Sequence, residues 1–175
     1  MSFAVWLTGL PASGKSTIAR ALLGRLHERG LRPALLESDA LRALLTPVAD
    51  YSERERQIFY GALAALAAWL VAHGVPVIVD ATAHQRAWRD AARATIGHFA
   101  EVHVDCPPEV CAARDPKGLY RLARAGETRT LPGAGVAYEP PTAPELIVAS
   151  DRITPVDAAQ QIVAMLDARG WLQIC

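Results

Sequence analysis

The stretch Gly9-Leu10-Pro11-Ala12-Ser13-Gly14-Lys15-Ser16-Thr17 fits the phosphate-loop pattern G-x-x-x-x-G-K-[ST]. A short apolar run, residues 4–8, precedes it and predicts a strand, while apolar residues at helical spacing after it predict a helix. A strand, a loop and a helix start in this order form an anion site, because backbone N–H groups and the helix dipole converge on phosphate. The stretch therefore predicts binding of nucleotide phosphates.

Different positions of this loop are expected to do different things. Lys15 should reach the β- and γ-phosphates of ATP, and the Ser16 hydroxyl should hold Mg²⁺. A glycine turn that only caps a helix is the alternative, but it does not require all motif positions and both flanks to agree as they do here. The other positions expected to bind the phosphates are Gly9, Ala12, Ser13, Gly14 and Thr17.

Length and composition favour one globular domain without a highly charged partner. The chain has 175 residues, about half of them apolar, and a formal net charge of zero. This length is enough for a core, and the charge balance gives no indication of nucleic-acid binding. Cysteines are few and lack zinc-site spacing, so we expect reduced thiols in a cytoplasmic protein. They are Cys106, Cys111 and Cys175.

The sequence also predicts a protein that acts away from membranes. The start of the chain lacks the basic region and apolar stretch of a signal peptide. The longest apolar run, residues 58–72, is too short to cross a bilayer easily. The sequence leaves open whether the protein is a monomer or a homodimer.

Strand-like and helix-like segments alternate along the chain. The run at residues 75–80 is apolar without interruption, which is typical of a parallel strand covered on both faces. Because parallel strands need crossover connections, the alternation predicts a three-layer α/β/α fold with a five-stranded parallel sheet in a single domain, residues 1–175. The expected strands are residues 4–8, 33–37, 75–80, 99–105 and 146–149.

Two carboxylates and an arginine follow the second predicted strand. Glu37, Asp39 and Arg42 stand where a strand ends and a helix begins, which is the ligand edge of an open α/β sheet. Either acid could take the proton of a substrate hydroxyl and hold Mg²⁺, while Arg42 holds a substrate anion. The alternative is that Ser38 or Asp39 only caps the helix.

The next elements carry further charged candidates. Ser52-Glu53-Arg54-Glu55 has the form of a capping box, which predicts a long helix from about Glu53. Arg56 near its start belongs either to the ligand site or to a solvated charge cluster. Asp80 ends the third strand, where it would hold Mg²⁺ through water or cap the segment that follows.

Farther along, the helix predicted within residues 82–97 carries a row of arginines at helical spacing, which we expect on a solvated face, with the alternative that one of them points at the ligand edge. They are Arg86, Arg89 and Arg93.

A long polar connection, residues 115–144, follows the fourth strand. A loop of this length is uncommon in a compact domain, and such loops are often functional lids. Asp115-Pro116 is expected to cap a short helix on which three basic side chains share a face. These are Lys117, Arg121 and Arg124.

The start of this connection is basic. Residues 114–129 contain five basic and two acidic residues, a surplus of three positive charges. Above a phosphate site, such a surplus suits a lid that closes over ATP. A solvated surface helix is the alternative explanation.

The lid resembles that of the adenylylsulfate kinases. The residues that carry the likeness are Arg114-Asp115-Pro116-Lys117-Gly118-Leu119-Tyr120, Ala123, Ala125-Gly126, Gly133, Tyr138-Glu139-Pro140-Pro141 and Pro144-Glu145-Leu146. Members of that family phosphorylate the 3′-hydroxyl of adenosine 5′-phosphosulfate (APS) with ATP and Mg²⁺. The resemblance extends over nearly the whole chain and implies a P-loop kinase fold with a lid at about residues 115–144.

The resemblance also implies roles for single residues. Asp39 is similar to the second acid of the family's D-G-D-x-x-R corner and would serve as base and metal ligand, with Arg42 as the corner's arginine. Arg56 matches the arginine of the family's D-R-x-E-N stretch and would bind the acceptor. Lys117 would lie in the lid near the phosphates, and Arg114 would flank the ATP adenine.

The likeness is incomplete at the acceptor side. Leu131 stands where the family has a phenylalanine that stacks on the substrate adenine, while Tyr51 keeps the other aromatic face. The ATP side is intact, so phosphoryl transfer should be kept while acceptor specificity changes. Other departures are Glu37-Ser38 in the corner, Ile58 and Phe59 for an acid and an asparagine, Gly61 and Ala62 for two arginines, and Thr82-Ala83-His84 for I-S-P.

Three functions remain open on sequence alone. The first is adenylylsulfate kinase, with ATP and APS as small-molecule substrates. The second is a kinase on the same scaffold that phosphorylates another nucleotide or small hydroxyl compound. The third is a catalytically weak nucleotide-binding module that regulates a partner, although intact Lys15, Ser16, Asp39 and Lys117 disfavour it.

Overall fold

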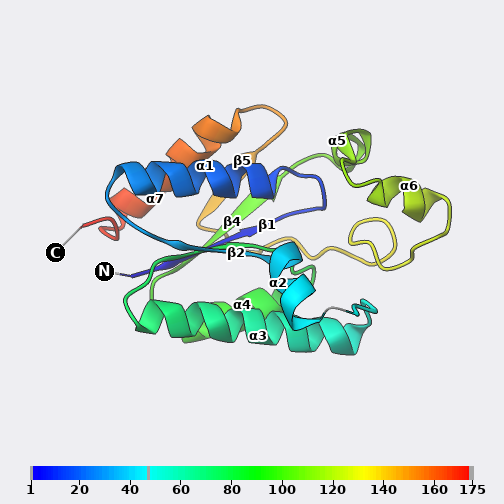
Figure 1. The fold of residues 1–175 in the computed structure, drawn as a ribbon. Coiled ribbons are helices and arrows are strands. Elements are labelled where there is room, and N and C mark those ends of the chain that lie inside the picture. The colour runs from blue at the N-terminus through cyan, green and yellow to red at the C-terminus, as the bar shows by residue number, and fades with distance from the viewer. Residues whose placement is uncertain (1, 47, 174–175) are drawn as a thin grey trace.

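The computed structural model, which describes residues 2–46 and 48–173, is built around one parallel sheet (Figure 1). Its strand order is β2-β3-β1-β4-β5, and all neighbouring strands run parallel. The predicted fold class and strand number are therefore confirmed. The strands are β1 (Ala4–Thr8), β2 (Ala34–Glu37), β3 (Val77–Asp80), β4 (Phe99–Asp105) and β5 (Leu146–Ala149).

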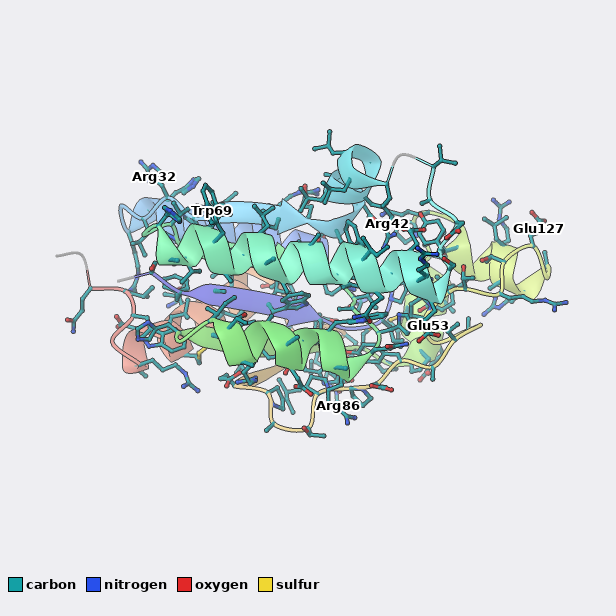
Figure 2. All side chains as sticks on the ribbon, turned by 90° about the horizontal axis from the view of Figure 1, so that it is seen from below. Arg32, Arg42, Glu53, Trp69, Arg86 and Glu127 are labelled. Atoms are coloured by element: carbon teal, nitrogen blue, oxygen red, sulfur yellow. The ribbon has the colours of Figure 1, made fainter. Side chains whose placement is uncertain are left out.

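Helices cover both faces of the sheet. Helices α1 (Lys15–Glu28) and α7 (Pro155–Ala168) lie on one face, and α3 (Glu53–Ala72) and α4 (Arg86–Thr95) on the other (Figure 1). Figure 2 shows α3 and α4 side by side, with Glu53 at the end of α3 nearer the lid. Apolar side chains of the strands fill one cluster under each helix pair. Double coverage explains why β1 and β3, which are buried throughout, show no polar alternation.

The three remaining helices lie beyond the carboxyl ends of the strands. They are α2 (Ser38–Leu45), α5 (Pro108–Arg114) and α6 (Leu119–Arg124). Within the described residues, no helix is both long and apolar enough to cross a membrane.

Local signals placed most helix starts correctly. The capping box is confirmed, because the Ser52 hydroxyl accepts a hydrogen bond from the Glu55 backbone N–H at 3.2 Å. Helix α4 is shorter than predicted, since residues 82–85 form a loop in which Ala83 has a φ of 40°. Cys106 and Cys111 are buried and free, as expected, whereas Cys175 lies outside the described residues.

The prediction that Arg89 lies on a solvated face is wrong. Its side chain is completely buried, and its Nε donates to the Glu101 carboxylate at 2.6 Å. Arg93 bonds the same carboxylate and Glu145. A buried cation is tolerated here because a buried carboxylate faces it directly.

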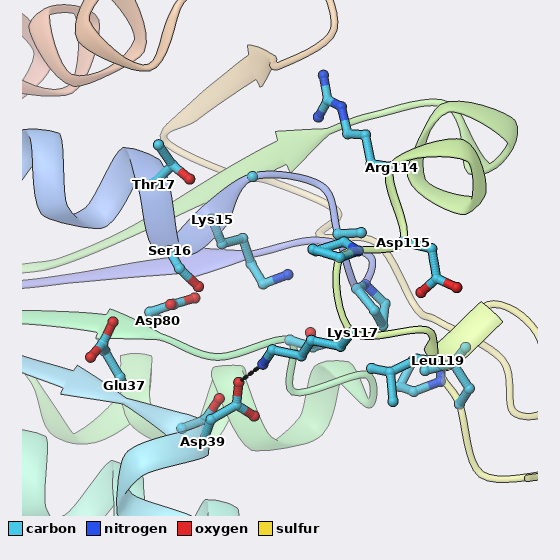
Figure 3. A pocket seen from close by; sticks show the side chains of 18 of the residues that line it. Lys15, Ser16, Thr17, Glu37, Asp39, Asp80, Arg114, Asp115, Lys117 and Leu119 are labelled. Atoms are coloured by element: carbon cyan, nitrogen blue, oxygen red, sulfur yellow. Dashed lines mark hydrogen bonds and ion pairs between the residues drawn. The ribbon is translucent and has the colours of Figure 1, made fainter. Parts of the chain in front are cut away.

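The lid contains one short helix and otherwise irregular chain. Asp115 caps this helix as predicted, accepting hydrogen bonds from the backbone of Tyr120 at 3.1 Å and Arg121 at 3.0 Å. Lys117, however, precedes α6, so the prediction that it shares one helix face with Arg121 and Arg124 is wrong. Its side chain instead extends from the loop toward the sheet (Figure 3).

Candidate active site

One large cavity of about 1110 Å³ opens at the carboxyl ends of the strands, between the phosphate loop, α2 and the lid. Nearly all the residues proposed from the sequence line it, although they come from five separate segments (Figure 3). Gly9 and Ser13 do not line the cavity. The predicted residues in the lining are Ala12, Gly14, Lys15, Ser16, Thr17, Asp39, Arg42, Tyr51, Arg56, Arg114, Lys117 and Leu131.

The phosphate loop needs its two glycines for different reasons. Gly14 has a φ of 100°, in the left-handed region that side chains disfavour. Gly9 lies so close to β4 that a Cβ atom there would come within 2.4 Å of the Val104 carbonyl oxygen. The loop can therefore turn tightly against the sheet and present the positive end of α1 to the cavity.

Lys15 folds back over this loop. Its Nζ donates to the carbonyl oxygens of Gly9 at 3.0 Å and Leu10 at 2.8 Å. Burial lowers the pKa of Lys15 to about 8, and the negative charge of Asp80 opposes this shift. A buried cation at this end of the cavity suits stabilisation of the charge on a transferring phosphoryl group.

Ser16 and Asp80 provide oxygen atoms suited to Mg²⁺. Asp80 is only 5% exposed, and its side chain lies beside the Ser16 hydroxyl (Figure 3). Burial raises the pKa of the Asp80 carboxyl, while Lys15 and the Ser16 hydroxyl oppose the shift. The described residues contain no group of three or more acidic, histidine or cysteine ligands. This donor set fits Mg²⁺, which usually keeps water and phosphate oxygens as its other ligands.

Asp39 lies at the opposite wall, on the first turn of α2. Its exposed carboxylate pairs with Lys117 Nζ from the lid. The capping alternative is not observed, because neither Ser38 nor Asp39 accepts a cap hydrogen bond through its side chain. Glu37, the competing acid, is engaged by Arg20 at 2.7 Å. Both acids line the cavity, but only Glu37 is held by an arginine of α1.

Arg42 is largely enclosed. Its side chain pairs with Glu55, and its guanidinium carbon lies 4.0 Å from the centre of the Phe59 ring. The two charged side chains are 10% and 12% exposed. This ion pair and cation–π contact occupy much of the guanidinium, which leaves less of its charge for a substrate.

Arg56 is buried as well, but its hydrogen-bond partners are neutral. Its Nε donates to the Tyr51 carbonyl at 3.0 Å, and its terminal nitrogens bond His84 Nδ1 at 2.9 Å and the Thr130 carbonyl at 2.5 Å. Burial lowers the pKa of Arg56. Arg56 therefore does not belong to a solvated charge cluster, which was the alternative prediction.

Two apolar surfaces flank these arginines. Tyr51, with a φ of 56°, lies at the cavity wall, and its ring centre is 5.0 Å from the Arg42 guanidinium and 5.8 Å from that of Arg56. Leu131 lines the cavity from the lid side and is 6% exposed. It packs in a small apolar cluster with Cys106, Cys111 and Tyr120.

Arg114 lies on the far side of the phosphate loop. It donates to the Ser150 carbonyl at 3.0 Å and to the Ser13 carbonyl at 3.4 Å. The Ser150 hydroxyl also donates to Ser13, at 2.6 Å. Arg114 and the loop after β5 thereby form one wall next to the phosphate loop, and that Arg114 flanks the ATP adenine stays a prediction.

Two participating residues were missed from the sequence. Glu55 was assigned only to a capping box, and His84 was noted only as a departure from the family pattern. The available signal was the placement of His84 just after a strand that ends at the ligand edge. Its partner, Arg56, is 28 residues away and could not be identified from spacing.

The phosphate loop, the acid Asp39 and the long connection at residues 115–144 line one cavity, which is the arrangement of P-loop kinases. Comparison with known families agrees: residues 1–149 match the sequence model of adenylylsulphate kinase. The chain belongs to the adenylylsulfate kinase family and is a phosphotransferase acting on a hydroxyl group.

Similar proteins support this assignment over most of the chain. A probable adenylyl-sulfate kinase of Archaeoglobus fulgidus is 41% identical over 152 residues, covering 87% of this chain and 98% of the relative. The adenylyl-sulfate kinase of Rippkaea orientalis is 39% identical over 168 residues, with 96% and 93% coverage.

A solved structure gives the same picture. The Mycobacterium tuberculosis APS kinase CysC, in complex with AMPPNP and APS, has a TM-score of 0.89 and 34% identity. The match covers 95% of this chain and 98% of that one.

Proposed function

We propose that this protein transfers the γ-phosphoryl group of ATP to the 3′-hydroxyl of APS. The observation that carries the proposal is that Lys15, Asp39 and Arg56 open into one cavity of about 1110 Å³. That volume is large for a single small-molecule site and can accept two nucleotides. The M. tuberculosis relative described above was solved with an ATP analogue and APS together, which supports the same pair of substrates here.

In this proposal the phosphate loop binds the ATP phosphates through its backbone N–H groups and Lys15. Ser16 and Asp80 hold Mg²⁺, directly or through water, and the ion supplies charge neutralisation at the β- and γ-phosphates when bound. The sequence named Asp39 as the second metal ligand, but Asp80 lies beside Ser16 and is the better candidate. Arg114 and Ser150 flank the ATP base.

Asp39 and Lys117 act on the reacting groups. Asp39 accepts the proton of the acceptor hydroxyl, since its carboxylate faces the cavity from the end of β2. Lys117 exchanges its ion pair with Asp39 for the negative charge that builds up during transfer. Catalysis then rests on positioning and charge stabilisation, as is general for phosphoryl transfer.

Arg56, Tyr51 and Leu131 form the acceptor end. Arg56 binds an anionic group of the acceptor, and the other two side chains contact its adenine. Leu131 provides apolar contact without stacking, a difference of roughly 0.5–1.5 kcal/mol for comparable aromatic pairs. Acceptor binding should therefore be weaker than in relatives that keep the ring.

The proposal is tested by coupled ADP release from purified protein with ATP and Mg²⁺. APS is compared with AMP, other nucleotides and small alcohols at equal concentration. We expect release above background with APS and identification of a 3′-phosphorylated product by mass spectrometry. Release with another acceptor but none with APS would contradict it.

The second candidate is a kinase of the same scaffold with another acceptor. It is favoured by one observation: Phe59, which replaces an asparagine of the family pattern, lies under Arg42 at 4.0 Å and provides no hydrogen bond. The acceptor panel distinguishes the two activities directly. A weak regulatory module, in contrast, would bind ATP and turn over none of the acceptors.

A further inference from the structure

The guanidinium of Arg56 is fixed by three chain segments at once. Its acceptors are the Tyr51 carbonyl before α3, the His84 ring after β3 and the Thr130 carbonyl in the lid. The first and last are backbone groups, so their positions depend on the path of the chain. His84 is the only side chain among these three acceptors, and it lies in the loop that follows β3.

None of these partners neutralises the positive charge. No carboxylate within the described part of the chain lies within ion-pair distance of Arg56, whereas Arg42 pairs directly with Glu55. Both terminal nitrogens of the Arg56 guanidinium retain further N–H groups beyond the two bonds described. The guanidinium is therefore oriented and still charged, with donors left for an anion in the cavity that it lines.

The contact also fixes the state of the imidazole. An arginine only donates, so His84 Nδ1 must accept, and the proton of the neutral ring is on Nε2. Burial and the Arg56 charge lower the pKa of His84 to about 4, although Glu139 and Glu53 oppose the shift. A neutral histidine can hold an arginine without cancelling its charge, which a carboxylate at this position would do.

The loop that carries His84 is itself held from several sides. Ala83 before it has a φ of 40°, and the Ala83 carbonyl accepts from the buried Arg89. The His84 carbonyl accepts from the Glu139 backbone at 2.8 Å, and its ring meets Trp88 edge to face at 4.9 Å. A backbone strained in this way persists only where its surroundings determine it.

We propose that His84 is a positioning residue for the acceptor: its neutral imidazole orients the Arg56 guanidinium toward an anionic group of the acceptor. This inference rests on the proposed function for the identity of the acceptor. The contact between His84 and Arg56 is independent of the proposed function. His84 touches neither substrate in this assignment and acts only through Arg56.

The test compares His84→Leu, which removes the acceptor atom, with His84→Asn, whose Oδ1 stands at the position of Nδ1. Loss of a hydrogen bond to a charged group corresponds to roughly a tenfold to hundredfold increase in KM for APS in His84→Leu. We expect kcat and the KM for ATP to change by less than about threefold, and His84→Asn to recover most of the APS affinity. His27→Leu, an exposed histidine on α1, is the matched control.

A double-mutant cycle separates positioning from a purely structural effect. In an Arg56→Ala background, His84→Leu should add less than about a twofold increase in KM, because the group it positions is gone. Equal effects of His84→Leu with and without Arg56 would overturn the inference, as would an unchanged KM in the single variant.

A second readout does not depend on turnover. Nitrogen NMR of the histidines at about pH 7 should show Nδ1 of His84 unprotonated, and its pKa should rise in Arg56→Ala, because burial still lowers it there but the Arg56 charge no longer does. If APS is not phosphorylated at all, the proposed function fails, and the cycle is run with the acceptor that does react. A His84 that titrates normally in the wild type would overturn the inference whatever the acceptor.

Discussion

Lys117 of the lid donates to the carboxylate of Asp39 on α2, so that one ion pair spans the cavity between its two walls (Figure 3). The two side chains are 59% and 75% exposed. Exposed pairs contribute little to folding, typically below about 1 kcal/mol. The pair therefore links two functional groups and can be exchanged for substrate at small cost.

Asp39→Asn should lower kcat while leaving the protein folded. Removal of a general base typically costs about a hundredfold or more in rate. We expect such a loss with a KM for ATP changed less than about threefold. Steady-state kinetics with APS give the rates, and thermal melting should show a Tm close to that of the wild type.

Glu37→Gln is the matched control for this change, since Glu37 is engaged by Arg20 at 2.7 Å. Its kcat should stay near the wild-type value. A large loss in Glu37→Gln together with an unchanged Asp39→Asn would reverse the assignment of the base.

Lys15→Ala should abolish most turnover. The change removes a buried positive charge from the place where phosphate charge develops, which costs roughly a hundredfold or more in kcat. Arg25→Ala, on the same helix but paired with Glu28 at the surface, should have no such effect. Near wild-type turnover in Lys15→Ala would remove the phosphate loop from the mechanism.

ATP binding should become weaker as the pH rises above about 8. The pKa of Lys15 is lowered to about 8 by burial, and nearby ATP phosphates favour its charged form. ATP thus raises this pKa, so the gain in affinity is complete below the pKa of the free protein and is lost as the pH rises from there through the higher pKa of the complex.

Isothermal titration calorimetry in buffers of different ionisation enthalpy measures this linkage. At about pH 9 the protein should take up protons as ATP binds, whereas Lys15→Arg should take up far fewer, because arginine stays charged. Equal uptake by both proteins would assign the proton to another group.

Arg42→Ala should destabilise the protein. The change leaves Glu55 nearly buried without its partner, which typically costs about 3 kcal/mol or more of unfolding free energy. Denaturant unfolding measures this loss. Arg42→Met/Glu55→Gln removes both charges, keeps an acceptor for the Tyr51 backbone and should recover most of the stability. If the double variant were as unstable as Arg42→Ala, loss of packing on Phe59 would be the cause instead.

Much of this protein is determined locally by its sequence. The phosphate loop is encoded in nine consecutive residues, because glycines, a strand end and a helix start must be adjacent to form it. Strands β1 and β3 follow from uninterrupted apolar runs, which are typical of strands covered on both faces. The cap of α3 at Ser52 and the cap of α6 at Asp115 depend on bonds within a few residues. For these features, the neighbours in sequence are also the neighbours in space.

The tertiary structure decided which charged side chains are left free to bind a ligand. Arg42, Arg56 and Arg89 are alike in sequence, yet one pairs with Glu55, one is held by neutral groups and one is buried against Glu101. Lys117 reaches Asp39 across 78 positions of the chain. The charge left on a side chain depends on its partners and its burial, and both are set when distant segments meet at the ends of the strands. Periodicity and spacing in the sequence do not show which distant segments come into contact.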